Sequence, residues 1–317
     1  MRTIQARESE RMFKTRPVSA YVLSAAIALL AAAAAAGGLF IHGLYRDNPF
    51  VTAIWWGNDL VTLAVAFPVL AASLALSLRG SLWARLVWLG MLDYTLYNFA
   101  FYLFGAAFNA FFLVYTALFA LSILALLFSL SRIDLRAVGH AFGAGGCTQG
   151  AEVAGAGAGG TGPAGHGIAG RGVPVRWIAG YMLLVAAGLC VIEVSQSLRF
   201  VFTGELPPVV ARVAHPTSVV FGLDLSLMVP FLVLGAVWLW RRRPWGFVLG
   251  VILNVKGTVY TLALVAASVF AARAGFPEAA GELPVWLFFT AGGLASSVLL
   301  LAGVRSKGGE VHETGTK

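Results

Sequence analysis

Four charged residues lie inside apolar stretches of this sequence, where a charge is costly enough to suggest a chemical role. Asp93, Glu193, Asp224 and Lys256 each interrupt a run of mostly apolar residues that is long enough to cross a bilayer. A charge inside a membrane helix costs at least about 2.5–3.5 kcal/mol on insertion scales, so it is normally paired, solvated or functional. These residues are therefore the first candidates for a functional site.

The depths of Asp93 and Lys256 predict that the two form an ion pair. Counted at 1.5 Å per residue from the starts of their runs, both lie about 15–17 Å deep, near the middle of an apolar core about 30 Å thick. A carboxylate can also take up a proton and lose its charge, and intramembrane acids of this kind form proton relays. The pair could thus alternate between mutual contact and contact with a proton or solute.

The other acids are expected nearer the outer surface. Glu193 and Asp224 lie in the outer third and Asp59 at the outer rim, so we expect them to share a vestibule that attracts protons or cations. Side chains lean toward the N-terminus of their own helix, and adjacent helices are antiparallel. Asp224 is therefore expected to point away from Lys256. A helix cap is the alternative role for Asp59.

Polar residues on the same runs complete the candidates for binding or proton coupling. At 100° per residue, Tyr97 shares a helix face with Asp93, whereas Tyr94 and Asn98 turn away from it. Hydrogen bonds that only fix helix packing are the alternative role for these residues. The outer histidines, His42 and His215, are expected to be solvated. The full set is Asp93, Lys256, Glu193, Asp224, Asp59, Tyr97, Asn98, Tyr94, Tyr260, Asn254 and Gln196.

The composition indicates an all-α, polytopic integral membrane protein. Hydrophobic residues make up 59% and charged residues 11% of the chain, against about 25% charged residues in soluble domains. The first apolar run is longer than the apolar region of a signal peptide, about 7–15 residues, so we expect it to be retained. Eight transmembrane helices are predicted, at residues 18–41, 57–78, 83–105, 110–130, 177–202, 219–240, 245–271 and 284–304.

The basic residues predict the orientation in the membrane. Of 22 Lys and Arg residues, all but five fall on one side of the predicted bilayer, which the positive-inside rule assigns to the cytoplasm. The exceptions are Arg46, Arg199, Arg212, Arg273 and the intramembrane Lys256. Both termini are then cytoplasmic, in a plasma (inner) membrane. The net charge of +8 is explained by this topology, and no nucleic acid is expected as a partner.

The chain divides into two similar halves. Residues 1–17 form a basic N-terminus, 18–130 a first four-helix half, 131–175 a flexible Gly-rich linker, 176–304 a second half and 305–317 a tail. Aligning Trp83 with Trp245 places Tyr94 opposite Lys256, which suggests a parallel 4+4 repeat. Chance similarity between apolar segments is the alternative. The first, fourth and eighth helices, rich in Ala, Leu, Val and Phe, are expected to face lipid.

Transport is the function that these features favour. We expect a transporter or permease for a small solute or cation, coupled to protons through the intramembrane carboxylates, with the lipid bilayer and the solute as partners. An intramembrane enzyme acting on a lipid or isoprenoid is one alternative, but the sequence lacks HExxH and GxSxG motifs. A scaffold whose charges only fix helix register is the other. No catalytic residue, metal site or cofactor is predicted. Cys147 and Cys190 are not expected to form a disulfide.

Overall fold

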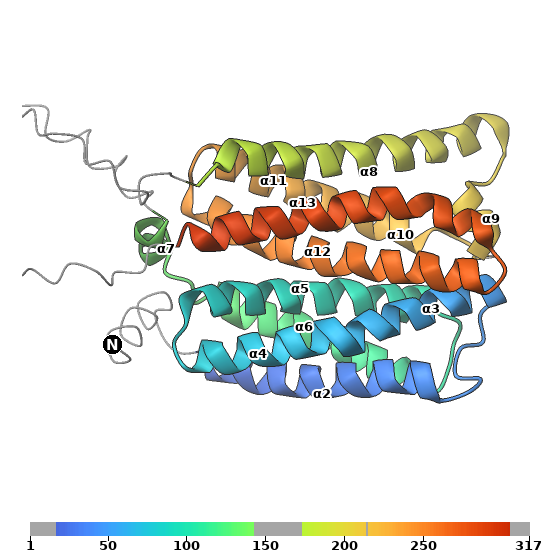
Figure 1. The fold of residues 1–317 in the computed structure, drawn as a ribbon, viewed down its shortest axis with the longest axis horizontal. Helices are drawn as coiled ribbons and strands as arrows, with labels where there is room; N and C mark the ends of the chain where they lie inside the picture. The colour runs from blue at the N-terminus through green and yellow to red at the C-terminus, as the bar shows by residue number, and fades with distance from the viewer. Residues whose placement is uncertain (1–16, 143–172, 214, 305–317) are drawn as a thin grey trace, which may run out of the picture.

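The computed structural model describes residues 17–142, 173–213 and 215–304, and these ranges form a bundle of long helices without strands (Figure 1). The first half contains α2 (Val18–Phe40), α3 (Pro49–Val61), η1 (Thr62–Ala66), α4 (Phe67–Leu78), α5 (Leu82–Gly105), α6 (Phe112–Leu130) and the short α7 (Leu135–Ala141). The second contains α8 (Val175–Thr203), α9 (Pro208–Val213), α10 (Val219–Leu223), η4 (Asp224–Met228), α11 (Val229–Trp240), α12 (Pro244–Arg273), η5 (Pro277–Glu282) and α13 (Leu283–Ala302).

Seven helical segments among the described residues are long and apolar enough to cross a membrane. They are Val18–Phe40, Pro49–Leu78, Phe112–Leu130, Val175–Thr203, Val219–Trp240, Pro244–Arg273 and Pro277–Ala302. The chain is therefore a helical, multi-pass membrane protein. The remaining predicted span, α5, has 24 residues, but its tyrosines, Asp93 and Asn98 make it less apolar than the other seven segments.

Two helices form the centre of the bundle, and they are the most polar ones. Helices α5 and α12 lie side by side (Figure 1), and α12 also packs against α3, α11 and α13. In the most apolar stretch of α12, 56% of the residues are buried, against 22% for the segment that contains α13. The prediction that α13 faces lipid fits this exposure. Helix α2, with 44% buried, is covered by α3, α4 and α6 instead.

Each half contains a π-helix that ends two residues before a proline. Helix η1 ends at Ala66, two residues before Pro68, and η4 ends at Met228, two residues before Pro230. Proline has no N–H, and its ring clashes with the carbonyl four residues earlier, so the regular hydrogen-bond pattern cannot continue there. A wide turn takes its place: the N–H of Phe67 donates to the Thr62 carbonyl, and that of Val229 donates to the Asp224 carbonyl.

The two halves also share their element boundaries. The shift in residue number that aligns Trp83 with Trp245 carries η1 onto η4 and α4 onto α11, residue for residue. It also carries the first residue of α5 onto that of α12. In the connecting turns it pairs Gly80, with φ of 94°, with Arg242, whose φ of 53° is a conformation that non-glycine residues seldom adopt.

The two seams between the halves differ in tightness. Where α3 crosses α12, a Cβ atom on Gly57 would lie 2.5 Å from the backbone of Ala267. The aligned pair on the other side is Val219 of α10 with Gly105 of α5, where a Cβ on Gly105 would lie 3.9 Å from the Val219 side chain. The backbones of α3 and α12 are thus in close contact, whereas α10 and α5 make an ordinary van der Waals contact.

The structure differs from the prediction of a flexible linker over residues 131–142. Asp134 caps α7 by accepting a hydrogen bond from the Arg136 backbone N–H at 2.9 Å. Beyond the helix, Phe142 stacks on Phe247 of α12, with ring centroids 4.6 Å apart. This short helix is therefore docked on the second half, and the rest of the predicted linker, 143–172, lies outside the described residues.

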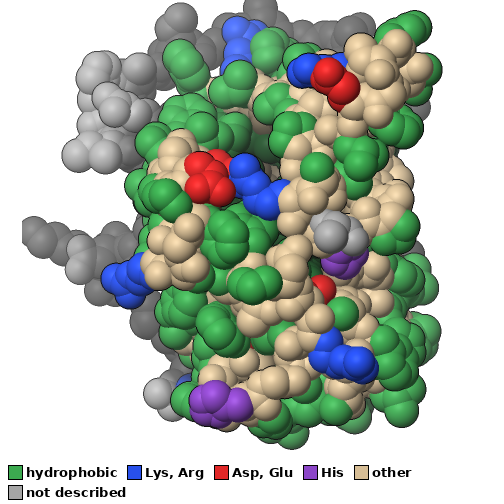
Figure 2. Space-filling view, turned by 90° about the vertical axis from the view of Figure 1, so that its right-hand side faces the viewer, with side chains coloured by type: hydrophobic (Ala, Val, Ile, Leu, Met, Phe, Trp, Pro, Cys, Tyr) green, Lys and Arg blue, Asp and Glu red, His purple; other side chains and the backbone are tan. Residues whose placement is uncertain are grey.

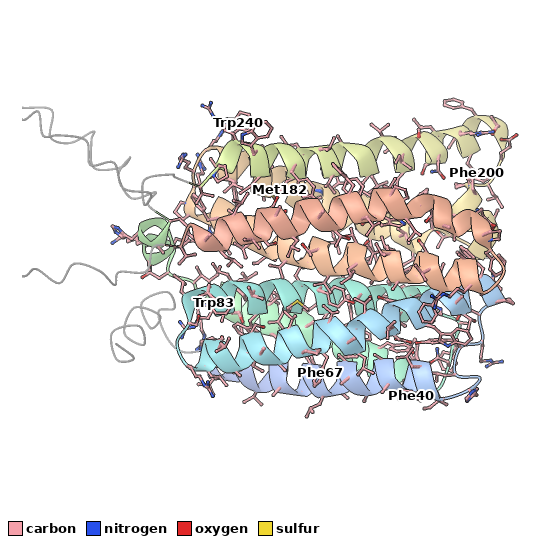
Figure 3. The ribbon with its side chains drawn as sticks, in the orientation of Figure 1. Phe40, Phe67, Trp83, Met182, Phe200 and Trp240 are labelled. Atoms are coloured by element: carbon pink, nitrogen blue, oxygen red, sulfur yellow. The ribbon has the colours of Figure 1, made fainter. Side chains whose placement is uncertain are left out.

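Exposed aromatic side chains mark both ends of the bundle. Trp83 and Trp240 lie at the end that carries α7, whereas Phe40 and Phe200 lie at the opposite end (Figure 3). All four are between 45% and 72% exposed. Aromatic residues at these positions are typical of the boundaries between lipid and water.

Candidate functional site

The predicted pairing of Asp93 with Lys256 is present in the structure. Lys256 Nζ lies 3.8 Å from Asp93 Oδ2, and the Lys256 side chain is only 4% exposed. Helices α5 and α12 can approach closely because Gly90, about one turn before Asp93, packs against Val255. The pair lies at this central crossing and joins one residue from each half of the chain.

Tyr97 provides a second contact for the same ammonium. Lys256 Nζ lies 4.0 Å from the centre of the Tyr97 ring, within the range of a cation–π interaction. The Tyr97 hydroxyl donates to Asp224 Oδ1 at 2.5 Å, and Tyr260 packs edge-on against its ring at 4.9 Å. Tyr97 therefore connects Lys256 to Asp224. The direction in which side chains lean along antiparallel helices had predicted that Asp224 would point away from the lysine.

Glu193 extends this group to α8. The Glu193 and Asp224 residues are 4% and 5% exposed, and their carboxyl groups interact electrostatically. Glu193 Oε2 is buried and has no hydrogen-bond partner among the described residues. We call Asp93, Lys256, Tyr97, Asp224 and Glu193 the central cluster. It holds three carboxyl groups and one ammonium.

Asp59 belongs to a different site, so the prediction of one vestibule for three acids is wrong for this residue. Asp59 Oδ2 accepts a hydrogen bond from the Tyr45 hydroxyl at 2.5 Å, and Oδ1 accepts one from Tyr102 at 2.8 Å. Burial, together with the nearby Asp59 carboxylate, raises the pKa of the Tyr45 phenol above its usual range, which keeps it a donor. A side chain on Gly38 would collide with this group, so Asp59 ties the loop after α2 to α5.

Two other predicted residues of α5, Tyr94 and Asn98, contact η1 and α3. Asn58 Nδ2 donates to Asn98 Oδ1 at 2.8 Å, and the Tyr94 hydroxyl lies 3.0 Å from that of Thr62. The division of α5 into two polar faces agrees with the predicted helical periodicity. Both contacts lie within the first half, so they tie its own helices together.

Asn254 and Gln196 lie outside the central cluster. Asn254 Nδ2 donates to the Gly250 carbonyl of its own helix at 2.7 Å, and the next turn of α12 meets α13 where Thr258 lies close to Gly293. Gln196 is half-buried on α8 beside exposed Ser195 and Ser197. The predicted polar stripe of α8 therefore faces the bundle mainly through Glu193.

A contact that the sequence did not indicate joins the halves at the end opposite α7. Asp47 Oδ1 lies 3.6 Å from His215 Nε2 and accepts a hydrogen bond from the Ala107 N–H at 3.0 Å. Next to it, Asn48 Nδ2 donates to the Arg212 carbonyl at 3.0 Å. His215, whose side chain is 22% exposed, is thus partly covered and not fully solvated. Figure 2 faces this end and shows its charged side chains as small separate groups.

The chemistry available to the central cluster is ion pairing and proton binding. Within the described ranges, no three His, Cys, Asp or Glu side chains lie close enough together to hold a metal ion. The cluster contains acids, phenols and one amine, buried together at the junction of the two halves. Comparison with known proteins gives no match to a family model, a curated protein or a solved structure.

Proposed function

We propose that this protein is a proton-coupled transporter of a small solute or cation in the plasma membrane. The observation that carries the proposal is the central cluster, in which Lys256 lies between Asp93 of the other half and Tyr97, with Asp224 and Glu193 beyond. Buried charges at this depth are expensive and are characteristic of ion and proton pathways. A cluster that joins both halves can also respond when the halves move relative to each other.

We also propose that the protein has eight spans arranged as a parallel 4+4 repeat, with α5 as the eighth. Three features support the repeat: the matching π-helices, the matching bounds of α4 and α11, and the matching turns at Gly80 and Arg242. An axis along the membrane normal relates the halves of other transporters built from parallel repeats, and their sites lie between the halves. The central crossing of α5 and α12 is such a position.

The repeat suggests a second partner for Lys256. Its alignment pairs Thr62 with Asp224 and Tyr94 with Lys256, and the first half contains the Thr62–Tyr94 contact at 3.0 Å. The equivalent contact in the second half is Asp224 with Lys256. In this proposal Lys256 exchanges Asp93 for Asp224 during transport, and the acid that is released takes up a proton.

The orientation follows from the basic residues. Arg79 and Arg241 lie in turns at the end that carries α7, and Arg132 follows α6 at the same end. We propose that this end and both termini face the cytoplasm. The Asp47–His215 contact then faces outward.

Proton flux in proteoliposomes tests the proposal. Asp93→Asn and Lys256→Met should each abolish flux, because each removes one partner of the proposed exchange. Each change should also lower the stability of the protein by about 3–5 kcal/mol, because it leaves the other partner of the buried pair uncompensated. The double variant should regain stability toward the wild type but not flux. Glu278→Gln, a change in an exposed acid, should behave as wild type. Full flux in both single variants would refute the assignment, and full biological activity of the double variant without any flux would favour the scaffold.

A further inference from the structure

The Glu193 and Asp224 carboxyl groups share one nearby cation, Lys256, with Asp93. Lys256, the ammonium of the central cluster, lies beside Asp93 at 3.8 Å. Asp224 uses one oxygen to accept the Tyr97 hydroxyl, whereas Glu193 Oε2 has no hydrogen-bond partner among the described residues. Two neighbouring buried carboxyl groups cannot both be ionised at low cost without a positive charge or a proton between them. The pair therefore holds either a shared proton or a bound cation.

A groove of about 560 Å³ lies among α8, α9, α10 and η4, and sequence neighbours of the two acids line it. Ser197, which lines the groove, lies one turn after Glu193, and its hydroxyl donates to the Glu193 carbonyl at 2.8 Å. Leu225 directly follows Asp224 and also lines the groove. Its wall is largely apolar, with Phe200, Leu206 and Phe221 among its residues. The volume falls within the range of small-molecule sites, about 300–1,000 Å³.

We propose that Glu193 and Asp224 bind the ammonium group of a monovalent organic cation, a primary amine whose apolar substituent lies in this groove. The inference rests on the proposed function, in which this cation is the transported solute. An ammonium group offers three N–H donors, and the pair offers carboxylate oxygens, including the unpartnered Glu193 Oε2. The apolar wall accepts the rest of the molecule.

The cluster itself shows that an alkylammonium suits this environment. The ammonium of Lys256 is held by a carboxylate at 3.8 Å and an aromatic face at 4.0 Å, the type of contact by which proteins recognise organic ammonium ions. A divalent metal ion is a poorer fit, since Mg²⁺ and Ca²⁺ take six or more oxygen ligands. The described residues offer no group of three His, Cys, Asp or Glu for such an ion.

Binding exchanges one positive charge for another. Without the amine, the two carboxyl groups share one proton; the entering ammonium forms ionic hydrogen bonds with both, and the shared proton leaves to solvent. One proton is released for each ammonium bound, and the charge of the site stays constant. The affinity must then rise with pH by at most about tenfold per unit, as linkage to a single proton requires.

Calorimetric titration of the purified full-length protein tests this proposal, with benzylamine as the probe and benzyl alcohol as its neutral analogue. Benzylamine should bind with release of about one proton, measured in buffers of different ionisation enthalpy, and more tightly at pH 8 than at pH 6. Benzyl alcohol should bind about tenfold more weakly or worse, because it leaves the carboxyl pair uncompensated.

Three variants locate the site. Glu193→Gln should weaken benzylamine binding about tenfold or more and abolish proton release. Ser226→Trp, which fills the groove from an exposed position, should weaken binding while any remaining binding still releases a proton. Glu278→Gln should match the wild type. Size-exclusion chromatography confirms folding, and Ser226→Trp carries the test if Glu193→Gln does not fold.

Equal binding of benzyl alcohol, or unchanged benzylamine binding in Glu193→Gln and Ser226→Trp, would overturn the inference, as would the absence of benzylamine binding. If benzylamine does not bind but flux still requires Asp93 and Lys256, the inference fails and the proposed function stands. If benzylamine binds as expected but flux survives in Asp93→Asn and Lys256→Met, the proposed function fails and the amine site stands.

Discussion

Lys256 shows how a membrane helix can hold a buried ammonium between unlike partners. Asp93 lies 3.8 Å from Nζ on one side, and the Tyr97 ring centre lies at 4.0 Å. The equal depths of Asp93 and Lys256 made this pair predictable from the sequence. The role of Tyr97 was not, because helical periodicity places a side chain on a face but does not determine which groups its hydroxyl reaches.

The Tyr97 hydroxyl should therefore contribute mainly through its hydrogen bond to Asp224. Tyr97→Phe keeps the ring against Lys256 but removes the donor to Asp224 Oδ1. Hydrogen bonds to charged groups contribute about 1.5–3 kcal/mol, so thermal denaturation in detergent should show a loss of this size. Tyr97→Leu should lose more, since it also removes the aromatic face. Equal stability of the two variants would contradict a role for the ring.

Asp59 shows where reasoning from depth fails at the level of single residues. Its position near the outer rim suggested that it joins Glu193 and Asp224, but two phenols, Tyr45 and Tyr102, hold its carboxylate within the first half. Tyr45 lies in a loop, and the sequence contains no periodic signal that would place a loop side chain on a neighbouring helix.

At the level of helices, the apolar runs predicted the elements well and their interior geometry poorly. The run lengths located the long helices to within a few residues in most cases. The π-helices η1 and η4 were not predicted, because a proline in a membrane helix is compatible with a kink as well as a wide turn. Helix α7 was missed because it is short and adjoins a Gly-rich stretch.

The close contact between α3 and α12 gives a prediction for Gly57. A Cβ at this position would lie 2.5 Å from the Ala267 backbone, which cannot move aside as a flexible side chain can. Gly57→Ala should thus destabilise the protein by about 1–3 kcal/mol through overpacking, measured by thermal denaturation. Gly188→Ala on α8, where nothing lies within 4 Å, is the matched control and should be neutral or slightly stabilising. A loss in both variants would point to a general effect of alanine.

For the whole molecule, the sequence predicted a helical membrane protein, and its division into two repeated halves stays a prediction. It could not predict which helices fill the centre, because contacts between apolar faces carry little sequence information. The polar helices α5 and α12 occupy the middle since only there can Asp93 and Lys256 avoid lipid.

The orientation can be tested with single cysteines in a Cys147→Ser, Cys190→Ser background. Ala274→Cys follows α12 at the end opposite α7, and Ser131→Cys follows α6 at the Arg-rich end; both positions are exposed. A membrane-impermeant maleimide applied to intact cells should label Ala274→Cys directly and Ser131→Cys only after permeabilisation. The reverse pattern would invert the proposed topology.

The unequal seams between the halves restrict how the molecule can move. Along one side, Gly57 and Ala267 meet at backbone distance, and neither helix can slide without breaking that contact. Along the other, Val219 and Gly105 leave room for separation. In the proposed transport cycle, the two halves therefore separate along the side near α10 and pivot about the crossing of α3 and α12.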